Sequence, residues 1–140
     1  RDADAPGVPN LILQGPYRGG FDWLVPVFGP GIIIFRAPDP ANLPQIDIPG
    51  STTTPPAQRT QVANALVIDA FEALQNSTSG PYKRIPASLN AGFVFASGTY
   101  TKESARRKTA TVIGGRRVLQ DTNNSTNDFQ IIATPTPRGF

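Results

Sequence analysis

The sequence contains no cysteine, no histidine and no methionine. Without cysteine, the chain can form no disulfide, zinc–thiolate site or thiol nucleophile of its own. Without histidine, it also lacks the imidazole that acts as general base in Ser-His-Asp hydrolases. Because the chain starts at Arg1 and contains no methionine, we expect it to be a processed product or a fragment whose N-terminal part lies elsewhere.

A long apolar run is missing as well, since no stretch reaches the roughly 20 residues that a membrane-spanning helix needs. The composition is that of a folded protein, with 39% hydrophobic and 16% charged residues. At 140 residues the chain suits a single domain spanning 1–140. Its 15 prolines and 13 glycines favour short strands joined by turns, so we expect a β-rich fold.

Several stretches predict strands directly. The β-branched run at 31–35 is bracketed by prolines and is too short for a helix. Residues 109–113 and 116–120 flank the pair Gly114-Gly115, which favours a two-residue hairpin turn because both turn positions need positive φ. A last strand is expected at 129–133.

Other segments are less decisive. Apolar residues at helical spacing predict an amphipathic helix in one segment: Val62, Leu66, Val67, Phe71 and Leu74. The continuous run at 66–68 equally predicts a buried strand, and periodicity does not choose between them. The proline-rich connector at 37–56 is expected to lack regular structure, and Val94 between two phenylalanines predicts a further strand.

The loop DTNNSTND at 121–128 raises the question of a bound ion. Its oxygen-bearing side chains are of the type that calcium prefers: Asp121, Asn123, Asn124 and Asp128. The loop has neither the glycine nor the twelfth-position acid of an EF-hand, however. Asn, Asp and Ser side chains also satisfy backbone groups within turns without an ion. We therefore expect a structural turn and no metal, while ion binding stays the alternative.

A basic cluster precedes this loop at Arg106, Arg107 and Lys108, with Arg116 and Arg117 following on the other hairpin strand. In a strand, Arg106 and Lys108 face one side and Arg107 the other. Such residues commonly protect a sheet edge. Contact with a partner protein or a glycan is the next interpretation, and a nucleic-acid stripe is disfavoured because the charge is split between faces.

Four aromatic residues form a candidate contact surface: Tyr17, Phe21, Trp23 and Phe28. Core packing is the competing interpretation. Catalytic chemistry has little support, because no base accompanies any serine and a working pair of carboxylates cannot be recognised from spacing. Asp69 and Glu72 are expected to be turn and surface groups.

The chain resembles a known type of domain. The closing segment with "LQDTNNSTNDF" and a Thr-Pro-x-Pro end is similar to lamin-tail-like domains of secreted and surface bacterial proteins. Together with the Arg-Arg-Lys strand, "VIDAFEAL" and "SLNAGF", it resembles a Bacteroidota surface lipoprotein family of unknown function, typically encoded beside SusC/SusD-type outer-membrane uptake systems. The resemblance implies an all-β, immunoglobulin-like sandwich lacking its N-terminal strands here, and a strand at 66–71. A lipoprotein's acylated cysteine is absent, which agrees with a fragment.

From this resemblance we expect a non-catalytic accessory protein, without a cofactor, on the extracellular face of the outer membrane. It would dock on a transporter or another surface lipoprotein, or help to capture the transporter's ligand, with membrane contact only through an anchor absent from this chain. The expected contact residues are Tyr17, Phe21, Trp23, Phe28, Arg106, Arg107 and Lys108. A glycan-binding module that stacks sugars on Tyr17 and Trp23, and a structural coat or filament protein, are the alternatives.

Overall fold

The structure is a computed structural model that describes residue 11 and residues 31–98 and 100–136. Contacts divide the chain into two compact units. One unit comprises Arg1–Phe21 and Ala37–Val62, and the other comprises Asp22–Arg36 and Ala63–Phe140. A single domain over 1–140 stays a prediction.

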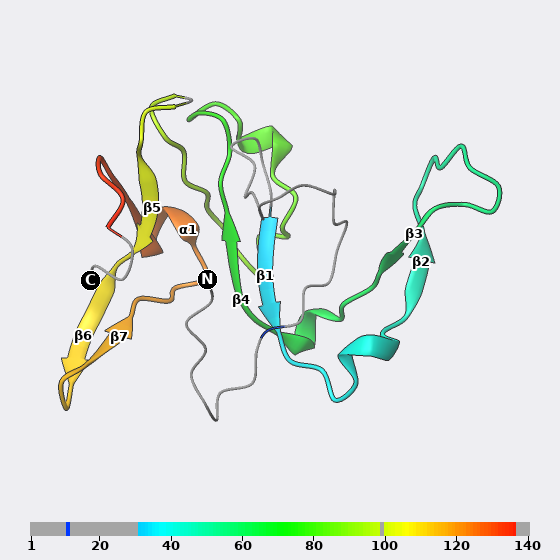
Figure 1. Cartoon of the computed structure of the whole chain (residues 1–140), viewed down its shortest axis with the longest axis horizontal. Helices are drawn as coiled ribbons and strands as arrows, with labels where there is room; N and C mark the ends of the chain where they lie inside the picture. The colour runs from blue at the N-terminus through cyan, green and yellow to red at the C-terminus, as the bar shows by residue number, and fades with distance from the viewer. Residues whose placement is uncertain (1–10, 12–30, 99, 137–140) are drawn as a thin grey trace. The chain divides into compact units, whose positions relative to one another are not determined.

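Short strands dominate both units (Figure 1). In chain order the elements are β1 (Gly31–Phe35), η1 (Pro40–Asn42), β2 (Gln45–Asp47), β3 (Gln58–Thr60), η2 (Asn64–Leu66), β4 (Val67–Glu72), η3 (Gly80–Tyr82), β5 (Ser104–Arg107), β6 (Thr109–Ile113), β7 (Arg116–Leu119), α1 (Ser125–Asp128) and β8 (Phe129–Ile132). Within the described residues the longest helix, α1, has four residues. The prediction of an all-β chain is therefore confirmed, and no described helix is long and apolar enough to cross a bilayer.

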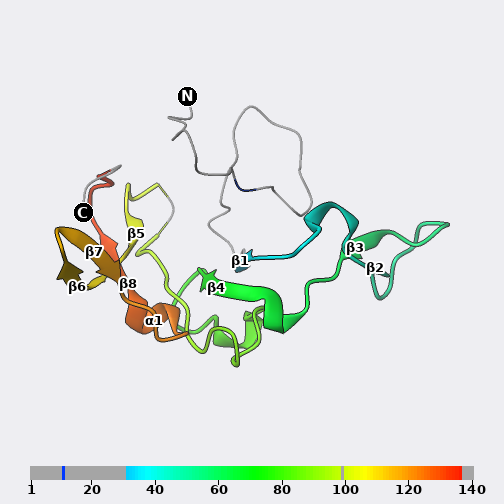
Figure 2. The same cartoon turned by 90° about the horizontal axis from the view of Figure 1, so that it is seen from below.

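The strands pair antiparallel in four two-stranded sheets: β1–β4, β2–β3, β5–β8 and β6–β7. Lys108 joins the last two sheets, because its backbone N–H donates to the Asp128 carbonyl and its own carbonyl accepts from the Gln120 N–H. Figure 2 shows β5 and β8 beside the β6–β7 hairpin. These links hold the hairpin at the end of the β5–β8 pair.

The segment with helical spacing is a strand. Val67–Glu72 pairs with β1 from Phe35 to Gly31, which confirms the strand predicted at 31–35 and the strand implied at 66–71. Pairing wins over helical periodicity because alternate residues of β4, Ala70 and Glu72, become buried on one side.

Two other predictions, for the connector at 37–56 and for the segment around Val94, are wrong. The connector at 37–56 contains β2, whose three residues pair with β3 because the prolines lie outside the paired positions. The strand predicted around Val94 does not form, because Val94 makes only an isolated parallel bridge to Ala73. The two hydrogen bonds of this bridge run from the Val94 N–H to the Glu72 carbonyl and from the Leu74 N–H to the Val94 carbonyl.

Among the described residues of the second unit, the buried side chains are few and unusually polar. The fully buried hydrophobic side chains among the described residues are Ala70, Leu74, Ile85 and Val94. The largest side chains with almost no exposure are all polar: Glu72, Asn90, Ser125 and Asp128. Buried polar groups are costly unless they are hydrogen-bonded, so hydrogen bonding must hold this region together.

The hairpin predicted from Gly114-Gly115 is confirmed. Both glycines have positive φ, 57° and 79°, and connect Ile113 directly to Arg116. A Cβ at either position would meet no atom within 4 Å, so only the backbone conformation requires glycine there.

This geometry gives a first prediction. Gly115→Ala should destabilise the hairpin by about 1 kcal/mol, because an L side chain is strained at positive φ. Gly114→Asn should cost less, because asparagine tolerates that region in two-residue turns. Amide hydrogen exchange of β6 and β7 measures both effects, and equal protection in Gly115→Ala and the parent protein would contradict the prediction.

Candidate functional site

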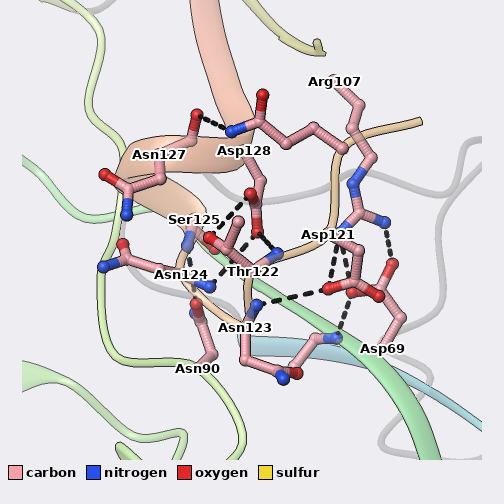
Figure 3. A network of polar contacts seen from close by, with 12 residues as sticks. Asp69, Asn90, Arg107, Asp121, Thr122, Asn123, Asn124, Ser125, Asn127 and Asp128 are labelled. Carbon is pink, nitrogen blue, oxygen red and sulfur yellow. Dashed lines mark hydrogen bonds and ion pairs between the residues drawn. The ribbon is translucent and has the colours of Figure 1, made fainter. Parts of the chain in front are cut away.

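The Asp128 side chain accepts several of the hydrogen bonds within the loop at 121–128 (Figure 3). Its carboxylate is buried and accepts hydrogen bonds from the Thr122 N–H at 2.8 Å, the Thr122 hydroxyl at 2.9 Å and the Asn124 N–H at 3.2 Å. Burial by itself would raise the pKa of Asp128, but these hydrogen bonds stabilise the carboxylate and hold its pKa below the usual value. The loop at 121–128 is thus held together by hydrogen bonds to the carboxylate of Asp128, one of its own residues.

Asparagine side chains tie this loop to the rest of the second unit. The fully buried Asn90 accepts from the Ser125 N–H at 2.7 Å and donates to the Gly92 carbonyl at 3.0 Å. Asn124 caps α1 by accepting from the Thr126 N–H at 3.0 Å. Ser125 in turn accepts from the Glu72 N–H of β4. The prediction that Asx and Ser side chains satisfy backbone groups here is confirmed.

Glu72 is a buried structural acid, so its assignment to the surface was wrong. Its side chain is 0% exposed and pairs with the Lys83 ammonium at 2.6 Å. Its other carboxylate oxygen accepts from the Arg84 N–H at 2.5 Å. Lys83 also donates to the Gly92 carbonyl, so this ion pair connects β4 to the segment that carries Gly92. Both carboxylate oxygens are engaged, as a buried charge requires.

Arg107 is the most constrained residue of the basic cluster. Its guanidinium makes a bidentate pair with Asp69, lies 3.6 Å from Asp121 and stacks 5.0 Å from the ring centroid of Phe129. The hydrogen bonds with Asp69 raise the pKa of Arg107 above its usual value, against the opposing effect of burial. Arg107 therefore links β4, β5 and β8, and Asp69 is its partner rather than a turn group.

A hollow of about 370 Å³ lies beside this cluster, between β5, β8 and the β6–β7 hairpin. We call it the basic groove. Its lining residues are Arg106, Arg107, Lys108, Thr109, Arg117, Gln120 and Gln130. The structure thus brings Arg106 and Lys108, predicted as contact residues, together with Arg117, which was not among the expected contact residues.

The hairpin has two distinct faces, because directly paired residues project to the same side of a sheet. The pairs Val112–Arg117 and Thr109–Leu119 define the groove face, which carries the two groove-lining residues of the hairpin strands. The pairs Thr111–Val118 and Ile113–Arg116 define the outer face. Ile113 and Val118 on the outer face are 65% and 40% exposed. Sequence alternation could have separated these faces, but the register shift between Thr109 and Thr111 obscured it.

The remaining predicted site residues divide in two. Tyr17, Phe21, Trp23 and Phe28 lie outside the described residues, so their role stays a prediction. Within residues 31–98 and 100–136, no group of three or more acidic side chains is arranged to hold a metal ion. The oxygens of Asn124 and Asp128 instead accept from the loop's own backbone.

The loop network gives a prediction about acid stability. A lowered pKa in the folded state means that Asp128 stabilises the fold above its unfolded pKa of about 3.9 and loses this contribution as the pH falls through the folded value. Asp128→Asn should therefore lower the free energy of unfolding at pH 7 by about 2 kcal/mol, since buried N–H groups lose acceptors. The deficit should shrink below about pH 4.

Urea unfolding of both proteins between pH 7 and pH 3 measures this deficit. Asp47→Asn, at an exposed acid in β2, serves as the control and should change stability at pH 7 by less than about 0.5 kcal/mol. A deficit for Asp128→Asn that is the same at both ends of the pH range would contradict the assignment.

Gly92 gives a separate prediction about the same network. A Cβ at Gly92 would lie 1.9 Å from Asn124 Oδ1, 2.5 Å from Thr126 Oγ1 and 2.9 Å from the Thr126 backbone nitrogen. Gly92→Ala should therefore destabilise the second unit by about 3 kcal/mol through displacement of α1. Gly98→Ala, whose Cβ would make only an ordinary 3.5 Å contact, is the matched control. Thermal unfolding compares the two, and equal midpoints would refute the close approach.

Comparisons with known proteins place this geometry in a wider group. The model of a family described as "Protein of unknown function (DUF4876)" matches residues 1–136. The chain is similar to a solved DUF4876 family protein from Bacteroides thetaiotaomicron VPI-5482, with 30% sequence identity and a TM-score of 0.64. The match covers 81% of this chain and 33% of that chain, so this chain spans about a third of its relative's length. Among curated proteins, none matches in sequence.

Proposed function

Because this chain belongs to the DUF4876 family of proteins of unknown function, we propose that it is a non-catalytic accessory protein of the bacterial cell surface. In this proposal the chain forms part of a lamin-tail-type, immunoglobulin-like sandwich and docks on an outer-membrane transporter protein of the SusC/SusD type. The Bacteroides relative is compatible with the predicted Bacteroidota origin. The transporter association derives from the resemblance of the sequence.

One observation carries the docking proposal: the β6–β7 hairpin exposes apolar side chains, Ile113 and Val118 on its outer face as well as Val112 and Leu119 on its groove face. Ile113 and Val118 lie on the outer face beside Arg116, and among the described residues β6 and β7 pair only with each other. Two-stranded hairpins are marginal alone and exposed strand edges readily accept a further strand. An extended segment of a partner could therefore add to this sheet by backbone hydrogen bonds.

Charge indicates what kind of partner segment fits. The hairpin strands carry Arg116 and Arg117 and no acidic residue. An added strand with apolar side chains opposite Ile113 and Val118, flanked by acidic side chains opposite Arg116, would complement this surface. A stable interface buries about 800 Å² per partner, more than one short hairpin offers. The aromatic residues predicted as contacts, Tyr17 to Phe28, would supply further area in this proposal.

The test replaces one apolar side chain of the outer face. Ile113→Glu in the full-length protein, tagged in the organism that produces it, should reduce recovery of an outer-membrane transporter protein by at least about tenfold, since a buried charge replaces an apolar contact. Ile46→Glu makes the same change at a 45% exposed position of the β2–β3 hairpin and should leave recovery unchanged. Quantitative mass spectrometry after mild crosslinking, followed by binding of the purified pair, provides the measurement.

Three results would contradict the proposal. Equal recovery of the transporter protein with both variants would exclude the outer face as the docking surface. Loss of folded protein in Ile113→Glu alone would mean that the outer face packs within its own polypeptide. Concentration-dependent self-assembly of the purified parent protein that Ile113→Glu abolishes would assign the face to a second copy, as a coat or filament protein requires.

A further inference from the structure

The basic groove combines positive charge with hydrogen-bond donors, and no acidic residue is among the described residues that line it. Its lining residues are four cations, two amides and one hydroxyl, and none of these described residues is acidic or aromatic. Its volume of about 370 Å³ is within the range of small-molecule sites. The lining therefore favours a small, negatively charged ligand.

The cations of the groove are not equivalent. The Arg107 guanidinium is neutralised by Asp69 and Asp121. Its role in the groove is therefore structural, and it is not expected to bind the ligand. Arg106 precedes Arg107 in β5 and therefore projects to the opposite face of the strand. The Arg106 guanidinium makes no hydrogen bond or ion pair with any residue that the structure describes. Lys108 donates to the Asn127 carbonyl at 2.6 Å, which leaves two of its three N–H donors. Arg106 and Lys108 thus present uncompensated charge.

The hairpin completes the groove from the other side. Arg117 projects to the groove face, where it lines the hollow and donates to the Thr109 hydroxyl at 3.4 Å. Gln120 donates to the Asn127 carbonyl at 3.0 Å through its amide nitrogen, which leaves its amide oxygen as an acceptor. Gln130, directly paired with Arg106 across β5 and β8, supplies a second amide.

We propose that the basic groove binds a small soluble oxyanion, a carboxylate or sulfate group carried by a hydroxylated molecule such as an acidic sugar. The forked guanidinium groups of Arg106 and Arg117 match the oxygens of such groups. The amides and the Thr109 hydroxyl match neighbouring hydroxyl groups. With no aromatic side chain in the lining, the groove lacks the stacking surface on which nucleobases and the faces of neutral sugars are held.

This inference goes beyond the proposed docking function and is independent of it. Docking uses Ile113 and Val118 on the outer face, whereas the ligand contacts the groove face. Ile113→Glu is therefore expected to abolish docking without weakening ligand binding. Substitutions in the groove have the opposite pattern, so the failure of one proposal leaves the other standing.

The experiment titrates the purified chain with glucuronate, glucose and sulfate, followed by NMR or calorimetry at low salt. Glucuronate and glucose share a hydroxylated ring and differ in charge, so saturable binding of glucuronate without glucose binding is the expected result. Sulfate as a separate probe distinguishes the anion alone from the sugar acid. Because the groove is open to solvent, affinity should be modest and should weaken as salt is added.

Three arginine-to-glutamine variants test whether the ligand binds in the basic groove. Arg106→Gln and Arg117→Gln should each weaken glucuronate or sulfate binding at least about fivefold. Arg116→Gln removes the same charge from the adjacent residue but on the outer face, and should change affinity less than about twofold. Equal losses in all three variants would show nonspecific attraction by net charge and overturn the proposal. So would the absence of saturable glucuronate or sulfate binding up to about 10 mM, or tighter binding of glucose.

Discussion

The buried carboxylate of Asp128 is the interaction on which this part of the fold depends. It satisfies backbone N–H groups at the start of the loop, and α1 ends at this same residue. Its carbonyl then accepts from Lys108, which fixes the point where β5 passes into the β6–β7 hairpin. Asp128 therefore relates a loop, a helical turn and a strand pair, through its carboxylate within the loop and through its backbone carbonyl at Lys108. Unsatisfied backbone donors in a buried loop would be costly.

The same principle applies to the other buried polar side chains among the described residues. Glu72 and Lys83, Asn90 and Ser125, and Arg107 and Asp69 each connect segments that the few buried apolar side chains do not span. Removing one partner from such a pair leaves the other buried and unpaired, so these contacts specify one arrangement strongly. These ion pairs also distinguish charged residues that hold the fold together from charged residues that have no opposite charge beside them. Arg107 is neutralised inside the network, and Arg106 beside it remains uncompensated at the groove.

Sequence reasoning was most successful where the partners are close in the chain. Gly114-Gly115 predicted the β6–β7 hairpin because the turn chemistry is local. It was less successful with Glu72, which is fully buried and accepts a hydrogen bond from the Arg84 N–H 12 positions away. It missed the basic groove as well. Thr109 and Arg117 belong to one hairpin, but the groove also needs Gln130 of β8, and no local pattern indicates that β8 pairs with β5.

The sequence alone determined the class of structure: prolines, glycines and short β-branched runs allow strands and turns and leave little room for helices. It also favoured a loop at 121–128 that satisfies its own backbone, because its Asn, Asp, Ser and Thr side chains are suited to that task. Only the tertiary structure decided which charged side chains pair with one another. Asp69 meets Arg107 across 38 positions and Asn90 meets Ser125 across 35, and such contacts depend on the packing of segments that lie far apart in the sequence. That packing leaves Arg106, Lys108 and Arg117 around one hollow.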